Sequence, residues 1–265
     1  MYAALPMYDL AAVRDVTDAL WHGIRDRLRD AGIAAPDGLT RDLPLDQGWI
    51  RPDLLLSQTC GLPFVRTLHG RVRLVAAVDH RLPGVAPGDY CSRIVVRRSD
   101  PDLGAVALAD YAGRCCAYNS PDSQSGAGAM RHLVLPMLRQ GRFFGRTLRT
   151  GGHFASVRAV AEGRADIAAI DAATWRLAER HLPEAAALQV LTSSDPTPGL
   201  PLITAPDGPA QPLFHAISAA LAALTAAQRG TIGIHGLVAR TEDDFAPIAA
   251  WDAEAAAAGY RELDG

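Results

Sequence analysis

Short apolar runs alternate with amphipathic segments along most of the chain. Runs with the length and the side chains of β-strands occur at 3–8, 52–58, 71–78, 91–98, 114–119, 146–150, 165–170, 188–194 and 199–205. Apolar positions three or four residues apart predict helices between these runs. The predicted helices are a long one before Gly32, a short one after 59–61, and others at about 126–137, up to Glu162, at 172–181, 209–227 and 242–258.

The first long helix shows how its ends are predicted. Asp9 stands where an N-cap is expected, and Gly32 stands where a glycine would end the helix. The apolar residues expected on its buried face are Val13, Val16, Leu20, Ile24 and Leu28.

Alternating strands and helices predict an α/β fold with mostly parallel sheets covered on both faces. Ligands bind such sheets at the loops that follow the carboxyl ends of the strands. Three polar loops follow predicted strands and precede predicted helices, at 59–61, 119–126 and 150–156. We expect them, together with Asp171, to line one cleft.

Composition narrows the function classes. Of 265 residues, 49% are hydrophobic and 21% are charged, as in ordinary globular proteins, and the net charge of −3 argues against nucleic-acid binding and an anionic-membrane surface. No apolar run approaches the roughly 20 residues that span a bilayer, so no membrane insertion is expected. The start "MYAALPMYDLAAVRD" lacks signal-peptide features, which predicts a cytoplasmic protein, or a periplasmic one if a leader was removed.

Two residue types limit the possible chemistry. All 26 basic residues are arginine, so lysine Schiff bases and a Walker A lysine are excluded, and an anion must be held by hydroxyls, backbone N–H groups, histidine or arginine. The cysteines have no metal-ligand spacing, and neighbouring strand residues point to opposite faces, so no disulfide between the adjacent pair is expected. We expect buried thiols at Cys60, Cys91, Cys115 and Cys116, with no metal and no cofactor.

The loop "SPDSQSGAGAM" (120–130) is the first candidate site. Ser123 and Ser125 lie where the next helix would have its N-cap and its unpaired N–H groups, which favour an anion. Gly126 and Gly128 would let a ligand approach the backbone. A simple helix cap and a nucleophile loop are the alternatives, although "SQSG" lacks the first glycine of a G-x-S-x-G elbow.

The segment "RTGGHFASVRAV" (149–160) repeats this arrangement. His153 and Ser156 are three residues apart at a helix start, where they would share one face. His153 is expected either to contact an oxyanion or to be an ordinary surface histidine, and a nucleophilic pair with Ser125 has no evident orienting partner. Asp171 ends a strand, either as a helix N-cap or as a carboxylate that accepts a proton from a protonated oxyanion.

Three stretches carry a family resemblance: "PDSQSGAGAMRHLVLP", "TGGHFASVRAVAEGRADIAAID" and "PGLPLITA". They resemble the phosphonate-binding group of type II periplasmic-binding-protein-like solute receptors, the receptor components of ABC transporters for phosphate, phosphite and phosphonate. The resemblance implies two α/β lobes joined by two crossover strands that act as a hinge, with 1–95 and 200–265 in lobe 1 and 96–199 in lobe 2. It also implies a non-catalytic protein that traps a small oxyanion between its lobes and works with a transporter permease.

The resemblance also assigns roles to individual residues. Its anion contacts fall on Ser123, Gln124, Ser125, His153 and Ser156, beside Gly126, and Gln124 replaces a threonine that is common there. Asp171 is the implied pocket carboxylate. Contacts expected from the other lobe are Tyr8, Thr59 and Tyr90.

Two alternatives stay open at the level of sequence. The same fold hosts cytoplasmic enzymes, including those of the futalosine route to menaquinone and a thiamine-pyrimidine synthase, and His153 or Asp171 would then act as acid or base. The second alternative is a cytoplasmic ligand sensor without a transport role.

Overall fold

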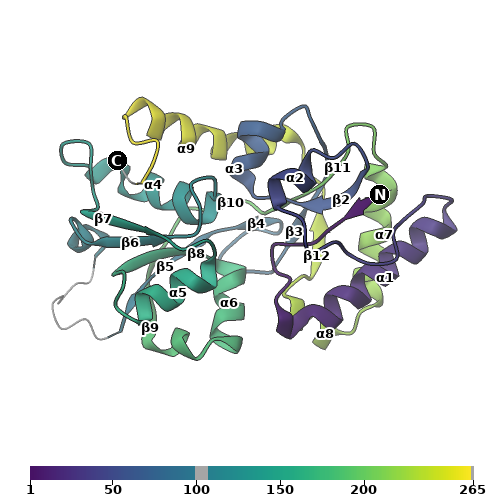
Figure 1. Ribbon diagram of the computed structural model, residues 1–265, viewed down its shortest axis with the longest axis horizontal. Helices are drawn as coiled ribbons and strands as arrows, with labels where there is room; N and C mark the ends of the chain where they lie inside the picture. Colours follow the sequence, from purple (N-terminus) through teal and green to yellow (C-terminus); the bar gives the residue numbers. More distant parts are fainter. Residues whose placement is uncertain (99–106, 264–265) are drawn as a thin grey trace. The chain divides into compact units, whose positions relative to one another are not determined.

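The computed structural model describes residues 1–98 and 107–263 (Figure 1). Contacts divide the chain into two compact units. Unit 1 consists of Met1–Asp89 and Pro198–Phe245, and unit 2 consists of Tyr90–Thr197 and Ala246–Gly265. The expected α/β architecture is confirmed, because each unit contains a five-stranded sheet and several helices.

Unit 1 contains a mixed sheet with the order β1-β2-β11-β3-β12. Its strands are β1 (Tyr2–Ala3), β2 (Leu54–Gln58), β11 (Pro201–Thr204), β3 (Arg73–Asp79) and β12 (Gly236–Val238). Its helices are α1 (Arg14–Asp30), α2 (Leu45–Trp49), α3 (Gly61–Pro63), α7 (Ala210–Ala223) and α8 (Ala226–Ile232), with shorter turns η1 (Ala11–Val13), η2 (Phe64–Leu68) and η7 (Glu242–Phe245).

Helix α1 buries the predicted face but begins later than predicted. Leu20, Ile24 and Leu28 are almost fully buried, and Gly32 follows the helix with a left-handed φ of 75°. The turn η1 precedes α1, so Val13 rather than Asp9 is the N-cap residue. Asp9 instead forms ion pairs, in which its carboxylate meets Arg41 and Arg14.

Unit 2 contains a second sheet with the order β7-β6-β8-β5-β9. Its strands are β7 (Arg146–Arg149), β6 (Cys115–Tyr118), β8 (Ile167–Asp171), β5 (Ser92–Arg97) and β9 (Leu188–Ser193), and β4 (Asp89–Tyr90) pairs with β10 (Thr197–Pro198) in a separate two-stranded sheet. Its helices are α4 (Ala129–Val134), α5 (His153–Ala161), α6 (Ala172–His181) and α9 (Ala246–Ala257), with shorter turns η3 (Leu108–Tyr111), η4 (Gln124–Gly128), η5 (Leu135–Met137) and η6 (Pro183–Ala187).

The sheets are less parallel than expected. In unit 2, β6 pairs parallel with β7 and β8, but β5 is antiparallel to both of its neighbours, β8 and β9. In unit 1, β11 is likewise antiparallel to β2 and β3. The strand β12 is also antiparallel to its neighbour β3. The strands β5 and β11 each come shortly after the chain passes from one unit to the other.

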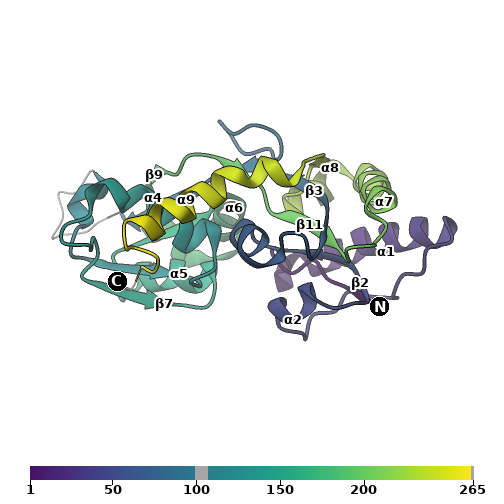
Figure 2. The same ribbon diagram turned by 90° about the horizontal axis from the view of Figure 1, so that it is seen from above.

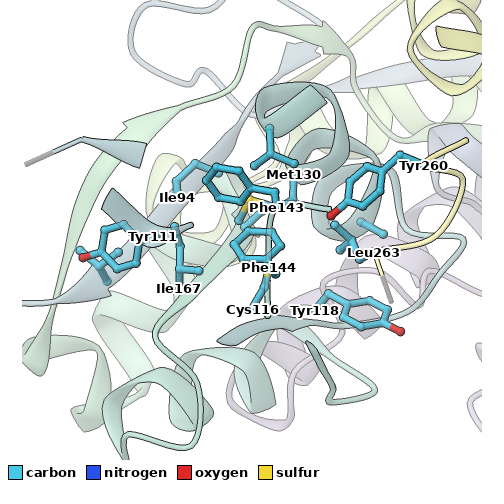
Figure 3. Packing of buried hydrophobic residues seen from close by; sticks show 14 residues of the cluster. Ile94, Tyr111, Cys116, Tyr118, Met130, Phe143, Phe144, Ile167, Tyr260 and Leu263 are labelled. Atoms are coloured by element: carbon cyan, nitrogen blue, oxygen red, sulfur yellow. The ribbon is translucent and has the colours of Figure 1, made fainter. Parts of the chain in front are cut away.

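Two apolar cores lie on opposite faces of the unit 2 sheet. Cys115 and Ala117 of β6 pack with α5 and α6, whereas Cys116 and Tyr118 belong to the cluster drawn in Figure 3, beside Met130 of α4. This alternation is the strand period of two. It confirms that the adjacent cysteines point apart, and all four cysteines are free thiols. The expectation of four buried thiols was wrong for Cys60, which is only half-buried.

The end of the chain packs in unit 2, although the expected boundaries place 200–265 in lobe 1. Figure 2 shows α9 beside α4, and Tyr260 and Leu263 join the same apolar cluster. The buried Arg131 of α4 pairs with Asp252 of α9 and donates to the carbonyl of Arg261. Residues 90–95, also expected in lobe 1, belong to unit 2 as well. Residues 99–106 and 264–265, expected in lobe 2 and lobe 1, lie outside the described residues.

The part of the chain that the structure describes limits the kinds of site. Within it, no single helix is long and apolar enough to cross a membrane, and α7 and α8, which together have the length and the apolar composition, are bent by 118° relative to each other. Within 1–98 and 107–263, no group of three or more His, Cys, Asp or Glu side chains is arranged to hold a metal ion.

Candidate functional site

Three polar strand-to-helix junctions lie next to one another at one edge of the unit 2 sheet. The strands β7, β6 and β8 are adjacent and parallel, so their carboxyl ends share that edge. β6 leads into η4 through 119–123, β7 leads into α5 through 150–152, and β8 leads directly into α6. This edge is where sheets of this type bind ligands.

Ser123 caps the first of these helical segments. Its hydroxyl accepts a hydrogen bond from the N–H group of Gly126 at 3.0 Å, and its backbone is extended, as at an ordinary N-cap. The simple-cap alternative therefore describes Ser123, and the Gly126 amide is already occupied.

Ser125 meets His153 across the two junctions. The Ser125 hydroxyl lies 2.9 Å from His153 Nε2, which joins the start of η4 to the first residue of α5. The Nδ2 atom of Asn119 lies 3.5 Å from the same ring nitrogen. Asn119 was missed at the level of sequence, and its only signal there is a single amide residue at the end of a predicted strand.

His153 is held in a setting that favours the neutral ring. Burial lowers the pKa of His153, while the charge of Asp171 and the backbone of Ala169 act in the opposite direction. The positive end of the α5 dipole also disfavours a charge on this first residue of the helix. The net direction is a pKa below the ordinary value, so His153 is neutral at pH 7.

The start of α5 has free hydrogen-bonding capacity. Its N-cap residue is Gly152, which has no side chain to cap the first N–H groups. The buried Ser156 hydroxyl lies 2.7 Å from the Thr150 hydroxyl, which donates to the carbonyl of Tyr118 or Gly152. This junction therefore presents hydroxyls and uncapped N–H groups together.

Asp171 caps the third junction. Its Oδ1 atom accepts from the N–H of Thr174 at 2.8 Å, so the N-cap alternative is correct, and its side chain is only 2% exposed. Its charge still acts on two neighbours, since it opposes the lowering of the His153 pKa and adds to the burial that raises the pKa of the Cys91 thiol. Asp171 thus serves as a cap and as the nearby negative charge.

Two of the expected contacts, Gly126 and Gln124, pack against neighbouring residues of unit 2. A side chain on Gly126 would place its Cβ 1.9 Å from Asn119 Oδ1, so this glycine makes room for Asn119. The Oε1 atom of Gln124 would lie 2.5 Å from a Cβ on Gly128, which places the buried Gln124 side chain over its own helical turn.

The remaining predicted residues are described within their own units. Tyr90, at the start of unit 2, is 1% exposed. In unit 1, the Tyr8 ring packs edge-on against His80 with 4.7 Å between centroids. Thr59 is fully buried, and its backbone N–H donates to Pro201 at 3.0 Å.

Within residues 1–98 and 107–263, no carboxylate completes the pair formed by Ser125 and His153 as the third member of a hydrolase triad. The Nδ1 atom of His153 is buried and makes no hydrogen bond to a carboxylate. The nearby Asp171 uses its Oδ1 atom on the N–H of Thr174. The arrangement therefore matches a binding site better than a nucleophilic one.

Comparisons with known proteins identify the family of the chain. A family model described as "ABC transporter, phosphonate, periplasmic substrate-binding protein" matches residues 53–248, more than half of the chain. No curated protein matches the chain. The family is one of transport receptors and not of enzymes, which decides against the enzyme alternative.

Several solved structures share the fold. PhnD1 from Prochlorococcus marinus, in complex with methylphosphonate, is 14% identical with a TM-score of 0.71, covering 96% of this chain and 97% of the other. A binding-protein component of an ABC phosphonate transporter from Pseudomonas aeruginosa is 18% identical with a TM-score of 0.68, covering 95% and 84%. A Xanthomonas citri protein bound to ATP is 16% identical with a TM-score of 0.69, covering 97% and 98%. The chain belongs to the phosphonate-binding family of periplasmic substrate-binding proteins of ABC transporters.

Proposed function

We propose that the sheet edge of unit 2 binds a small oxyanion of the phosphate, phosphite or phosphonate type. The observation that carries this proposal is the uncapped start of α5 beside the contact between Ser125 and His153. A helix N-terminus offers N–H groups and a positive dipole to an anion, and neighbouring hydroxyls add direct hydrogen bonds. Family membership and the methylphosphonate complex of a structural neighbour point to the same ligand class.

The proposed contacts differ in their support. Ser125 and His153 form the centre, because their side chains meet across two adjacent junctions. Ser156 belongs to the second of these junctions, where its hydroxyl contacts that of Thr150. Ser123 and Asp171 cap the helical segments that follow them. The negative charge of Asp171 also acts on His153. The other proposed ligand contacts are Gln124, Gly126, Tyr8, Thr59 and Tyr90.

Calorimetric titration with methylphosphonate, phosphite and phosphate tests the proposal. We expect Ser125→Ala to weaken binding of the preferred anion by about 1–3 kcal/mol, the usual range for losing a hydrogen bond to a charged group. Thr225→Ala is the control, because Thr225 also carries a helix-capping hydroxyl but caps α8 in unit 1. It should leave the affinity unchanged. Absence of binding by all three anions, or equal affinity in Ser125→Ala, would contradict the proposal.

A nucleotide is a useful second ligand in the same titration. One structural neighbour is bound to ATP, whose phosphates share the chemistry of the smaller anions. If ATP binds more tightly than methylphosphonate and Ser125→Ala weakens both equally, the recognised group is a phosphate within a larger ligand.

We further propose a periplasmic location and a permease of an ABC transporter as the partner. Both follow from the family, whose members are periplasmic receptors of such transporters. Stimulation of a reconstituted transporter's ATPase activity by the loaded protein, but not by Ser125→Ala at the same methylphosphonate concentration, would support this partner.

A further inference from the structure

Asn119 occupies the point where two of the three junctions meet. Its backbone carbonyl accepts from the N–H of Gly151 at 2.9 Å, which ties the loop after β6 to the loop after β7. Its side chain lies between Gly126 and the His153 ring. A single residue therefore contacts both helix starts that are proposed to hold the anion.

The two ends of the Asn119 amide face different neighbours. Its Oδ1 atom lies against Gly126, is buried and has no hydrogen-bond partner. Its Nδ2 atom faces His153 Nε2 at 3.5 Å. An amide nitrogen is only a donor, so this orientation suits a ring whose Nε2 atom accepts.

The surroundings of His153 leave its proton on the opposite nitrogen. The ring is neutral at pH 7, so one nitrogen donates and the other accepts. With Nε2 accepting, the proton lies on Nδ1, which is buried and has no hydrogen-bond partner among the described residues. The backbone of Ala169 favours a protonated ring. The Ser125 hydroxyl, 2.9 Å from Nε2, then donates to the ring.

The charged groups around α5 do not change this assignment. Asp171, at the end of β8, is the charged group that acts on the His153 ring. Arg97 of β5 donates to the Val160 carbonyl, and Glu184 of η6 pairs with Arg158, both away from the first turn. The side chains that β6 and α6 present to this face are Cys115, Ala117, Trp175 and Ala178.

We propose that Asn119 is a positioning residue that fixes His153 in the tautomer protonated on Nδ1, so that the site selects an oxyanion that still carries one proton. A ligand hydroxyl then donates to Ser125 Oγ, and Ser125 donates to His153 Nε2. No proton is transferred in this arrangement. A fully deprotonated oxyanion has no hydrogen to donate to Ser125. The Ser125 hydroxyl then donates its own hydrogen to His153 and forms no hydrogen bond with the ligand. The selection rests on the proposed function, whereas the tautomer does not.

Nitrogen NMR of the histidine ring in the ligand-free protein tests the tautomer directly. The wild type should show His153 neutral at pH 7 with the proton on Nδ1. Asn119→Asp replaces the donor with a charged acceptor of the same size and should move the proton to Nε2. The exposed His181 at the end of α6 serves as an internal reference in the same spectrum. A wild-type ring protonated on Nε2, or an unchanged ring in Asn119→Asp, would overturn the inference.

A matched ligand pair tests the selection. Methylphosphonate as a monoanion carries one hydroxyl, whereas methanesulfonate has the same charge and shape without one. We expect the wild type to bind methylphosphonate about tenfold more tightly, a factor worth one hydrogen bond. Asn119→Asp should lose most of this preference because Nε2 now donates to Ser125. Equal affinities in the wild type would overturn the selection.

Two further outcomes keep the tests separable. If neither ligand binds, the proposed function fails and the NMR result still decides the tautomer. If Asn119→Asp does not fold, Asn119→Ala replaces it, since truncation only removes atoms beside Gly126. In that variant the Nδ1 preference should weaken to a mixture of tautomers, and an unchanged ring would overturn the role of Asn119.

Discussion

The junction after β6 and the junction after β7 both contain glycine and serine but use their polar groups differently. In the first, Ser123 closes the helix start by accepting from Gly126. In the second, Gly152 leaves the start of α5 without a side-chain cap. Both junctions follow parallel neighbouring strands, so both lie at the same edge of the sheet, although β7 is the outermost strand and β6 lies between β7 and β8.

This difference in capping gives the two junctions different roles in binding a ligand. A capped helix has one of its free N–H groups satisfied internally, whereas an uncapped one keeps them for a ligand. The junction after β6 therefore supplies side chains, above all Ser125, and the junction after β7 supplies backbone donors. The contact between Ser125 and His153 joins the two.

The largest expected effect distinguishes the two junctions by their glycines. Gly126→Ala should lower the free energy of unfolding by about 2–3 kcal/mol, because its Cβ would lie 1.9 Å from Asn119 Oδ1. Gly152→Ala should cost far less, since its extended backbone suits alanine and no atom lies within 4 Å of the new Cβ. Urea unfolding of both variants measures the difference, and equal losses would contradict the assigned packing.

The two serines of the first junction should separate stability from affinity. Ser123→Ala removes an N-cap and should cost about 1 kcal/mol of unfolding free energy. Ser125→Ala should reduce methylphosphonate affinity more than Ser123→Ala does. Unfolding and calorimetry on both variants test this, and a larger affinity loss in Ser123→Ala would reverse the roles.

The buried His153 should make stability depend on pH. Its pKa in the folded state is lowered below the value of about 6.5 in the unfolded chain. As the pH falls below 6.5, the unfolded chain binds more protons, so the free energy of unfolding decreases by at most about 1.4 kcal/mol per pH unit.

His153→Gln provides the comparison for this pH effect. Its stability should vary less between pH 7 and pH 5 than that of the wild type, because glutamine does not titrate. Urea unfolding at several pH values measures both slopes. Identical slopes would show that His153 titrates alike in the folded and unfolded states.

The smallest expected effect concerns the third junction. Asp171→Asn keeps an N-cap acceptor for Thr174, so stability should change by only a few tenths of a kcal/mol. It removes the negative charge that opposes the lowering of the His153 pKa, so that pKa should fall further. An NMR titration of the histidine rings measures this pKa. A rise of the His153 pKa in Asp171→Asn would contradict the assigned interaction.

Much of the fold was predictable because strands and helices depend on local patterns. The predicted helix 172–181 and its predicted N-cap residue, Asp171, agree with the structure. The start of α1 was mispredicted, because one turn of tighter helix before Val13 has no distinct apolar pattern. The end of the chain was assigned to the wrong unit, because apolar residues such as Tyr260 and Leu263 would suit the core of unit 1 as well as that of unit 2.

The candidate site was only partly predictable. Ser123 and Ser125 are two residues apart in one loop, and nothing in their local sequence shows which one caps the helix. Asn119 was missed because an amide at the end of a strand is common in loops. Its importance arises from contacts with Gly126 and His153, which belong to different junctions.

The sequence by itself determined most of the longer strands and helices, the polar loops after the strands and the absence of lysine, because these depend on residue type and short-range periodicity. It did not predict the short strands β4, β10 and β12. Only the tertiary structure decided which hydroxyl is a cap and which faces His153. Ser125 and His153 are 28 residues apart, and they meet because β6 and β7 pair in parallel and end at the same edge. A hydrogen bond of this kind forms only if its two atoms lie within a narrow range of distances. The pairing of the strands sets that distance, whereas the local sequence does not.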